Sequence, residues 1–269
     1  MFPILDIGNI IPSLDCDMEN LIHLNRGSVA HNVKVKEYPD YYDLTIASRP
    51  DYFLPAGYEV AGWRSSEPKA RAKGEAGTAE SLAKSLQRAR RAVRDIAACS
   101  DFTHFVTLTL DAEKIERYDY DVIIKRVNAW LSNAVARKEL RYVLIPEFHK
   151  DGAIHFHGLW SGRLSYVDSG HYTKAGQKIY NLLDWKWGYT GCIELEGEYA
   201  KVCNYIMKYI TKGSRKVGGR WYLSGGKIRK PTVRYSDAEY REIPASGRYV
   251  PAGRVSFKYM RIDKNSKTD

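Results

Sequence analysis

The sequence predicts an α+β fold, because strand-like and helix-like patterns alternate along the middle of a chain of 269 residues. Short runs rich in Val, Ile, Thr and Phe are typical of strands, whereas apolar residues that recur with the helical period are typical of helices. Taken in order, these patterns predict a strand, a helix, a β-hairpin, another strand and a final helix. Apolar residues make up 44% of the chain, which is enough for a buried core.

Residues 1–77 are predicted to form an N-terminal extension. Residues 1–30 show no clear period. From His31 to Ser48, apolar residues alternate with polar ones on both sides of a Pro39-Asp40 turn, which predicts a small hairpin. Residues 55–77 are rich in Gly, Pro, Ser and charged residues, a composition typical of a surface loop.

A helix is predicted from Thr78, which can cap it, to about Ala98. Its apolar face is formed by residues at helical spacing: Leu82, Leu86, Ala89, Val93 and Ile96. Another face carries a basic stripe, which consists of Lys84, Arg88, Arg91 and Arg94. Such a stripe is usually a solvated face, but in a basic chain it is also a candidate for contacts with phosphate groups.

The following elements are predicted from propensity and spacing. Thr103 to Leu110 has the composition of a strand, and a second helix begins at Asp119 or Asp121. The inner face of this helix is predicted to consist of Ile123, Val127, Trp130, Leu131 and Ala134. Beyond the hairpin described next, Ser161 to Lys186 is expected to be a long connection, and Gly188 to Leu195 another strand.

The most informative stretch is a predicted hairpin from Arg141 to Trp160, with Asp151-Gly152 as its turn signal. His155 and His157 lie two residues apart in its second strand. Because successive side chains of a strand point to opposite faces, both imidazoles are expected on one face. Two imidazoles on one rigid face form a chelating pair for a divalent metal ion. The alternative interpretation is a hairpin with two solvated histidines.

Glu147 is the candidate for a third metal ligand, and the register of the hairpin decides whether it reaches the histidines. A two-residue loop, Asp151-Gly152, would place Glu147 opposite Phe156, on the wrong face. A three-residue loop from Lys150 to Gly152, with Gly152 in the left-handed region, would place Glu147 opposite His155. A metal site therefore requires the longer loop or an equivalent bulge.

A last helix is predicted from Glu198 to Lys212. One side of it is apolar, and the opposite side carries tyrosines and lysines, namely Tyr205, Tyr209, Lys201, Lys208 and Lys212. The two tyrosines are four residues apart, so they stack along one face. The lysines are expected to favour the phenolate, which is the nucleophilic form of tyrosine. The alternative is an exposed face without a special function.

The charge of the chain favours a polyanionic partner, most simply nucleic acid. The formal net charge is +10, and the 20 tyrosines suit stacking on unpaired bases. The four cysteines form no C-x-x-C pair, which disfavours a zinc ribbon and favours reduced cytosolic thiols. No signal peptide and no membrane-spanning run is predicted, so we expect a soluble intracellular protein.

Three motifs follow one another along the chain. A strand motif is formed by Phe105 to Leu110, a histidine motif by His155-Phe156-His157, and a Y-x-x-K-Y-x-x-K motif by the residues from Tyr205 to Lys212. In this order they resemble the motifs of HUH endonucleases of the rolling-circle replication initiator type. The tyrosine motif is most similar to that of the two-tyrosine initiators of phages with single-stranded DNA, and related proteins occur in plasmids. The segment from Trp221 to Pro231 also resembles one that follows the tyrosine helix in such proteins.

The resemblance implies a ferredoxin-like, RRM-like antiparallel sheet of about five strands with flanking helices. It assigns residues 78–231 to an HUH endonuclease domain and leaves residues 232–269 as a basic C-terminal tail, partly ordered. It also implies a divalent metal ion, Mg²⁺ or Mn²⁺, with His155, His157 and Glu147 as ligands. The remaining site residues that it implies are Tyr205 and Tyr209 as nucleophiles, with Lys208 or Lys212 positioning phosphate or metal.

The implied function is to nick and rejoin single-stranded origin DNA through a 5′-phosphotyrosyl intermediate, while the free 3′ hydroxyl primes the host polymerase. Lys201 joins the basic stripe as a candidate DNA contact. The expected partners are single-stranded or supercoiled origin DNA, host DNA polymerase and helicase, in the cytoplasm of a bacterial host. Two alternatives are a single-stranded-DNA transposase or plasmid relaxase of the same superfamily, and a non-catalytic nucleic-acid-binding module on an RRM-like fold.

Overall fold

A computed structural model describes residues 31–51, 79–195, 199–210, 215–236, 250–252 and 255–264. The chain divides into two compact units. One unit is Ala76–Lys230, and the other combines Met1–Glu75 with Pro231–Asp269. The predicted extension of residues 1–30, the predicted loop of residues 55–77 and the predicted cap at Thr78 lie outside the described residues.

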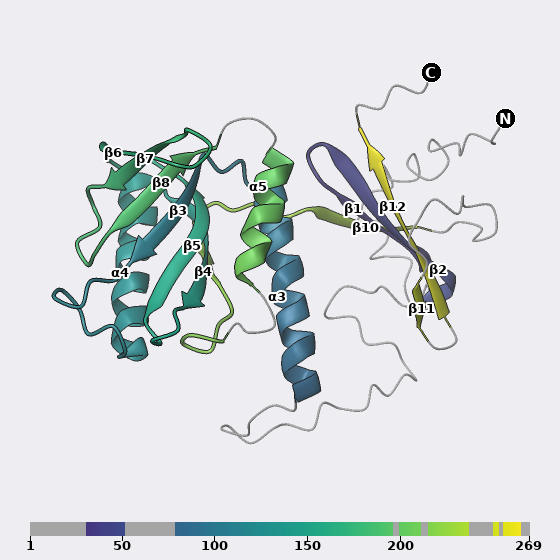
Figure 1. The fold of residues 1–269 in the computed structure, drawn as a ribbon. Helices are drawn as coiled ribbons and strands as arrows, with labels where there is room; N and C mark the ends of the chain where they lie inside the picture. The colour runs from purple at the N-terminus through teal and green to yellow at the C-terminus, as the bar shows by residue number, and fades with distance from the viewer. Residues whose placement is uncertain are drawn as a thin grey trace. The chain divides into compact units, whose positions relative to one another are not determined.

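The unit Ala76–Lys230 is built on a seven-stranded sheet in which all neighbouring strands are antiparallel. The strand order is β6-β7-β8-β3-β5-β4-β9 (Figure 1). The strands are β3 (His104–Thr109), β4 (Arg141–Phe148), β5 (Ile154–Ser161), β6 (Tyr166–Tyr172), β7 (Lys178–Leu182), β8 (Thr190–Glu194) and β9 (Leu223–Gly225). The strand with the two histidines, β5, therefore lies between β3 and β4.

The predicted α+β class with an antiparallel sheet is confirmed, but the predicted number of about five strands is wrong. The main difference lies in residues 161–186, which were expected to be a connection and instead contain β6 and β7. The register of this pair shifts between Asp168 and His171. Because such an irregularity interrupts the two-residue alternation, the pattern of a strand is hidden in the sequence. The short β9 adds a further strand at the edge next to β4.

One face of this sheet is covered by α4 (Tyr120–Lys138) (Figure 1). Asp119 caps the helix by accepting a hydrogen bond of 3.0 Å from the backbone N–H of Val122, which confirms one of the two predicted start positions. The predicted inner face is also confirmed, because four of its residues are buried and Trp130 is half-buried. These side chains pack on sheet residues that include Val106, Leu108, Ile154, Phe156 and Trp160.

The opposite face is covered by α3 (Ala79–Cys99) and α5 (Tyr199–Ile206) (Figure 1). Their buried residues pack on sheet residues that include Phe105, Val143, Ile145 and Leu159. The predicted apolar face of α3 is correct except for Leu82, which is 46% exposed. Leu82 lies one turn before Leu86, where the helix first enters the core. No helix among the described residues is long and apolar enough to cross a membrane.

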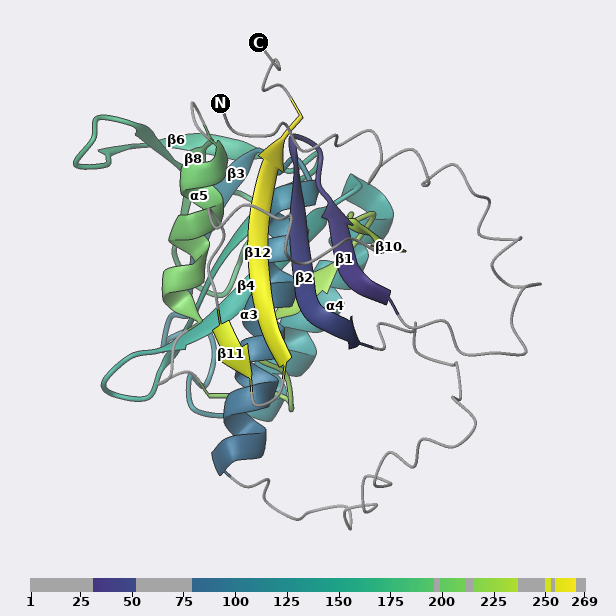
Figure 2. The same ribbon diagram turned by 90° about the vertical axis from the view of Figure 1, so that its right-hand side faces the viewer.

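The other unit contains a five-stranded antiparallel sheet with the order β10-β1-β2-β12-β11. The predicted hairpin is confirmed as β1 (His31–Glu37) and β2 (Tyr41–Asp51), and Figure 2 shows β1, β2 and β12 side by side. Three strands come from the segment that was expected to be a basic tail: β10 (Thr232–Ser236), β11 (Val250–Ala252) and β12 (Val255–Asp263). The core of this sheet is formed by Val33, Val35, Leu44 and Ile46.

Candidate active site

The loop between β4 and β5 has the length that a three-ligand site requires. His149 donates a backbone hydrogen bond of 2.9 Å to the carbonyl of Ala153, so the loop proper is Lys150 to Gly152. Gly152 has φ +91°, in the left-handed region. Glu147 is consequently paired with His155. The prediction of the longer loop and of this register is confirmed.

Both histidines lie on the sheet face that α3 and α5 cover. Their neighbours Ile154 and Phe156 are fully buried in the core on the α4 side. The ring of His157 instead contacts Phe105, whose side chain belongs to the core beneath α3 and α5. The centroids of the two imidazole rings are 6.4 Å apart. The predicted arrangement of both imidazoles on one face is therefore confirmed.

Two threonines of β3 orient the imidazole rings. Thr107 Oγ1 is hydrogen-bonded to Nδ1 of His157 at 3.0 Å, and Thr109 Oγ1 to Nδ1 of His155 at 3.3 Å. Each threonine is paired with its histidine in the β3–β5 register. With Nδ1 occupied in this way, Nε2 is the nitrogen left for other contacts. The sequence did not reveal these partners, although their two-residue spacing equals that of the histidines.

The carboxylate of Glu147 reaches the second histidine of the pair. Its Oε2 lies 2.7 Å from Nε2 of His157. The Glu147 side chain is 46% exposed and that of His157 only 12%, so the carboxylate lies at the solvent side of the imidazole. A carboxylate oxygen and an imidazole nitrogen thus converge on one point above the sheet.

The histidines are predominantly neutral at physiological pH. Burial, followed by the charges of His149 and His157, lowers the pKa of His155 to about 4. Burial also lowers the pKa of His157, although the nearby carboxylate of Glu147 acts in the opposite direction. Neutral imidazole is the form that binds a metal ion.

The donor set fits a divalent cation in its chemistry. Two neutral imidazoles and one carboxylate are common ligands of transition metals, and a hydroxyl behind each imidazole is a typical outer partner. As they stand, no three His, Cys, Asp or Glu side chains within the described ranges form a metal-binding group. The direct contact between Glu147 and His157 accounts for this, because the two atoms bond to each other. Ligand atoms that share an ion at about 2.1 Å lie roughly 3 Å apart, close to the observed separation of this pair.

His149 is a member of the site that the sequence analysis did not single out. Its ring lies over that of His155, with centroids 3.7 Å apart. It lies two residues beyond Glu147, so it shares the face of the other candidate ligands. The signal was present in the sequence as the spacing of Glu147 and His149, which equals that of the two histidines of β5.

The two tyrosines lie above the histidine pair. The ring of Tyr209 stacks on that of His157, with centroids 4.0 Å apart. The hydroxyl of Tyr209 donates a hydrogen bond of 2.9 Å to that of Tyr205, and the rings of both contact Phe105. Tyr205 is 42% exposed, whereas Tyr209 is half-buried. The tyrosine and histidine motifs therefore meet at one place on the sheet.

The helix that carries the tyrosines is shorter than predicted. The α-helix ends at Ile206, and Met207–Tyr209 continue as a 3-10 turn, η2. Cys203, Ile206 and Ile210 point into the core with α3, which confirms the predicted apolar side. The tighter turn alters the angle between the tyrosines.

The expectation that lysines favour the phenolate is wrong for Tyr209. Burial and the hydrogen bond to Tyr205 raise the pKa of Tyr209, since both stabilise its neutral form. Lys208 lies with its Nζ 4.8 Å from the ring centroid of Tyr205. Lys212 and the side chain of Lys201 lie outside the described residues, so their roles stay predictions.

The basic stripe of α3 is exposed to solvent at all four positions: Lys84, Arg88, Arg91 and Arg94. Lys84 forms an ion pair of 2.6 Å with Glu80, one turn earlier in the helix. This pair offsets part of the positive charge at the start of the stripe. A role in phosphate contacts stays a prediction.

Comparison with known proteins adds one finding at this point. Residues 103–214 match the family described as replication-associated protein ORF2. The matched stretch covers less than half of the chain but includes β3, the histidine hairpin and the tyrosines. No curated protein and no solved structure matches the chain. The family match supports a role in the initiation of DNA replication, with origin DNA as a partner.

Proposed function

We propose that this protein is a rolling-circle replication initiator of the two-tyrosine HUH type, which nicks and rejoins single-stranded origin DNA. The observation that carries the proposal is the stacking of Tyr209 on His157, with the Tyr205 hydroxyl bonded to that of Tyr209. A nucleophile pair and a chelating pair, from distant parts of the chain, thereby share one surface.

The residues of the site divide into two groups by task. His155, His157 and Glu147 would hold a divalent ion, Mg²⁺ or Mn²⁺, while Thr107 and Thr109 fix the imidazole rings. Such an ion, when bound, supplies positive charge that polarises the scissile phosphate. Because the imidazoles are neutral and oriented before a ligand arrives, little reorganisation is required of them.

The tyrosine hydroxyl carries out the covalent step. Its oxygen attacks phosphorus and forms a bond to the 5′ side of the nick, while the bond from phosphorus to the 3′ oxygen breaks. The phenol loses one proton and the departing 3′ oxygen gains one. The hydrogen bond from Tyr209 to Tyr205 offers the first part of a path for this proton. The phosphotyrosyl bond retains the energy needed for rejoining.

The second tyrosine has a use in the closing reaction. After one round of synthesis a new 5′ end must be accepted while the first is still bound. Tyr205 and Tyr209 have their hydroxyl oxygens 2.9 Å apart, so either oxygen can take the position of the other after a small movement. Host polymerase would extend the 3′ hydroxyl, and a helicase would supply the unwound strand.

A labelled oligonucleotide that carries the candidate origin, mixed with the protein and Mn²⁺, tests the proposal. The wild type should form a covalent adduct that survives denaturation, and the doubly substituted Tyr205→Phe/Tyr209→Phe protein should form none. Adduct formation by the double variant would refute the assignment of the nucleophiles. The matched control is Tyr189→Phe, which removes the hydroxyl of an exposed tyrosine just before β8 and leaves both motifs intact.

A non-catalytic nucleic-acid-binding module is the second candidate, and one observation favours it. Glu147 and His157 already satisfy each other through their 2.7 Å contact, which needs no metal. This candidate predicts DNA binding that is insensitive to Mn²⁺ and to His155→Ala. The same preparations distinguish it from the enzyme, because it yields no adduct under any condition.

A further inference from the structure

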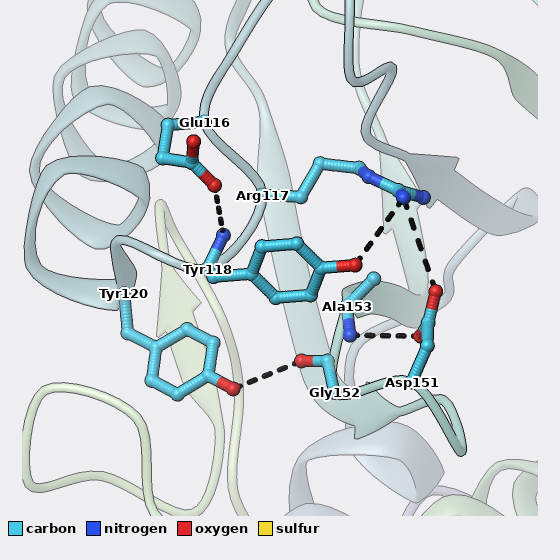
Figure 3. A network of polar contacts seen from close by, with 7 residues as sticks. All are labelled: Glu116, Arg117, Tyr118, Tyr120, Asp151, Gly152 and Ala153. Atoms are coloured by element: carbon cyan, nitrogen blue, oxygen red, sulfur yellow. Dashed lines mark hydrogen bonds and ion pairs between the residues drawn. The ribbon is translucent and has the colours of Figure 1, made fainter.

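The segment between β3 and α4 is bonded to the β4–β5 loop beside the candidate active site (Figure 3). Tyr120 donates a hydrogen bond of 2.9 Å from its hydroxyl to the carbonyl of Gly152. Within the loop, the backbone N–H of Ala153 donates to Oδ1 of Asp151 at 3.0 Å. Within the segment, the backbone N–H of Tyr118 donates to Glu116 at 3.1 Å. The loop is therefore held in place without a contribution from Arg117.

Arg117 has few and long contacts for a guanidinium group. Its Nη2 lies 3.5 Å from the hydroxyl of Tyr118 and 3.9 Å from Oδ2 of Asp151 (Figure 3). Its Nε is buried and has no hydrogen-bond partner in the part of the chain that the structure describes. A guanidinium presents five N–H donors, and a buried donor without an acceptor costs about 1–3 kcal/mol. Such a group is suited to an acceptor that arrives with a ligand.

The surroundings of Arg117 indicate what that ligand is. The guanidinium lies close enough to His155 for its charge to oppose protonation of the imidazole. It also lies 5.6 Å from the ring centroid of Tyr118, and that tyrosine is 49% exposed. A fork of N–H donors matches the oxygens of a phosphate, and an exposed aromatic ring beside it suits an unpaired base. Together they match one nucleotide of a single strand.

We propose that Arg117 binds a DNA phosphate next to the histidine site and that the ring of Tyr118 stacks on the adjoining base. The inference rests on the proposed function for the identity of the strand. It assigns the segment before α4 to substrate positioning, a task that no motif of the chain indicates. A strand held there runs past the β4–β5 loop toward His155.

A purely structural role for Arg117 makes a different prediction. In that case its ion pair with Asp151 would matter, and Asp151→Asn would weaken DNA binding as much as Arg117→Gln does. Asparagine keeps the Oδ1 acceptor for the backbone N–H of Ala153, so the loop itself is preserved. If Arg117 binds phosphate, Asp151→Asn instead leaves affinity unchanged or raises it, because a competing negative charge is removed.

The test measures the affinity of the full chain for a fluorescent single-stranded oligonucleotide in EDTA, over a range of KCl concentrations. Arg117→Gln should weaken binding at least about tenfold and reduce the slope of log affinity against log salt by about 0.7, the value for one phosphate contact on a single strand. Arg126→Gln is the matched control, because Arg126 is exposed on α4, on the opposite face of the sheet. It should show a clearly smaller change in both quantities.

A second variant separates a lost contact from a disturbed fold. Arg117→Lys keeps the charge and should retain the wild-type slope, while its affinity falls because the planar fork is lost. Tyr118→Leu should weaken binding without a change of slope, because stacking releases no counterions. A slope of Arg117→Gln equal to that of Arg126→Gln, or equal losses in Arg117→Gln and Asp151→Asn, would overturn the proposal.

The outcome for this contact is distinguishable from the outcome for the proposed function. The same wild-type preparation is tested for the covalent adduct with Mn²⁺. Adduct formation together with unchanged binding in Arg117→Gln contradicts the phosphate contact alone. Binding that depends on Arg117, without any adduct, contradicts the enzymatic function and supports the contact.

Discussion

The ring of Tyr209 lies on the ring of His157, with an angle of 18° between the planes. His157 belongs to the central strand β5, whereas Tyr209 belongs to the 3-10 turn that follows α5. Phe105 of β3 contacts both rings, at centroid distances of 6.2 and 6.0 Å. The relationship is therefore fixed from three elements, and it determines which parts of the site act together.

The position of Tyr209 predicts an unequal effect of the two single tyrosine variants. Tyr209→Phe should reduce the initial nicking rate more than Tyr205→Phe, because Tyr209 is the one against His157. Both proteins should fold normally, since phenylalanine keeps the ring contacts. Rates of adduct formation in single-turnover reactions measure the difference. A larger loss in Tyr205→Phe would show that the exposed tyrosine attacks first.

The threonines of β3 predict a loss of metal affinity without a loss of ligands. Thr107→Val and Thr109→Val each remove a hydroxyl that orients an imidazole while keeping the shape of the side chain. Loss of such an outer partner typically weakens metal binding about 10- to 100-fold. Calorimetric titration with Mn²⁺ measures the change. Thr45→Val in the other sheet is the control, and an equal effect there would reject the role of the hydroxyls.

The β4–β5 loop predicts that one glycine matters for binding as well as for stability. Gly152 and Gly176 have φ of +91° and +83°, so alanine at either position should destabilise the fold by about 1–2 kcal/mol. Only Gly152→Ala should weaken Mn²⁺ binding, because its loop sets the register of Glu147. Chemical denaturation and metal titration of both variants provide the comparison. Equal metal affinity in the two variants would separate the loop from the site.

The packing of α3 predicts different costs for the same substitution one turn apart. Leu86→Ala should destabilise the protein by about 2–5 kcal/mol, because Leu86 is 8% exposed and lies in the core beneath α3. Leu82→Ala should cost less than about 1 kcal/mol, since Leu82 is 46% exposed. Denaturant midpoints measure both. A large effect at Leu82 would restore the wider apolar face that its spacing suggested.

Features that depend on one element or one turn could be predicted from the sequence. The two-residue period of β5 placed His155 and His157 on one face, and the alternatives for the loop were few enough to be compared. The requirement that Glu147 share this face then selected the three-residue loop, which the structure contains. The N-terminal cap and inner face of α4 followed in the same way from helical spacing.

Features that depend on packing between elements could not be predicted. The raised pKa of Tyr209 results from burial against His157, whereas the sequence showed only the neighbouring lysines. The stacking of His149 on His155 results from the hairpin register together with the free rotation of two side chains. The contact of Arg117 with the loop joins residues 34 positions apart that carry no common pattern.

Anomalous diffraction from crystals soaked in Mn²⁺ tests the central claim most directly. The account predicts a single strong peak bonded to Nε2 of His155, Nε2 of His157 and a carboxylate oxygen of Glu147, beneath the ring of Tyr209. Glu147 would then exchange its direct contact with His157 for a shared ion. Saturating Mn²⁺ with no peak at this position, and with Glu147 still bonded to His157, would contradict the account.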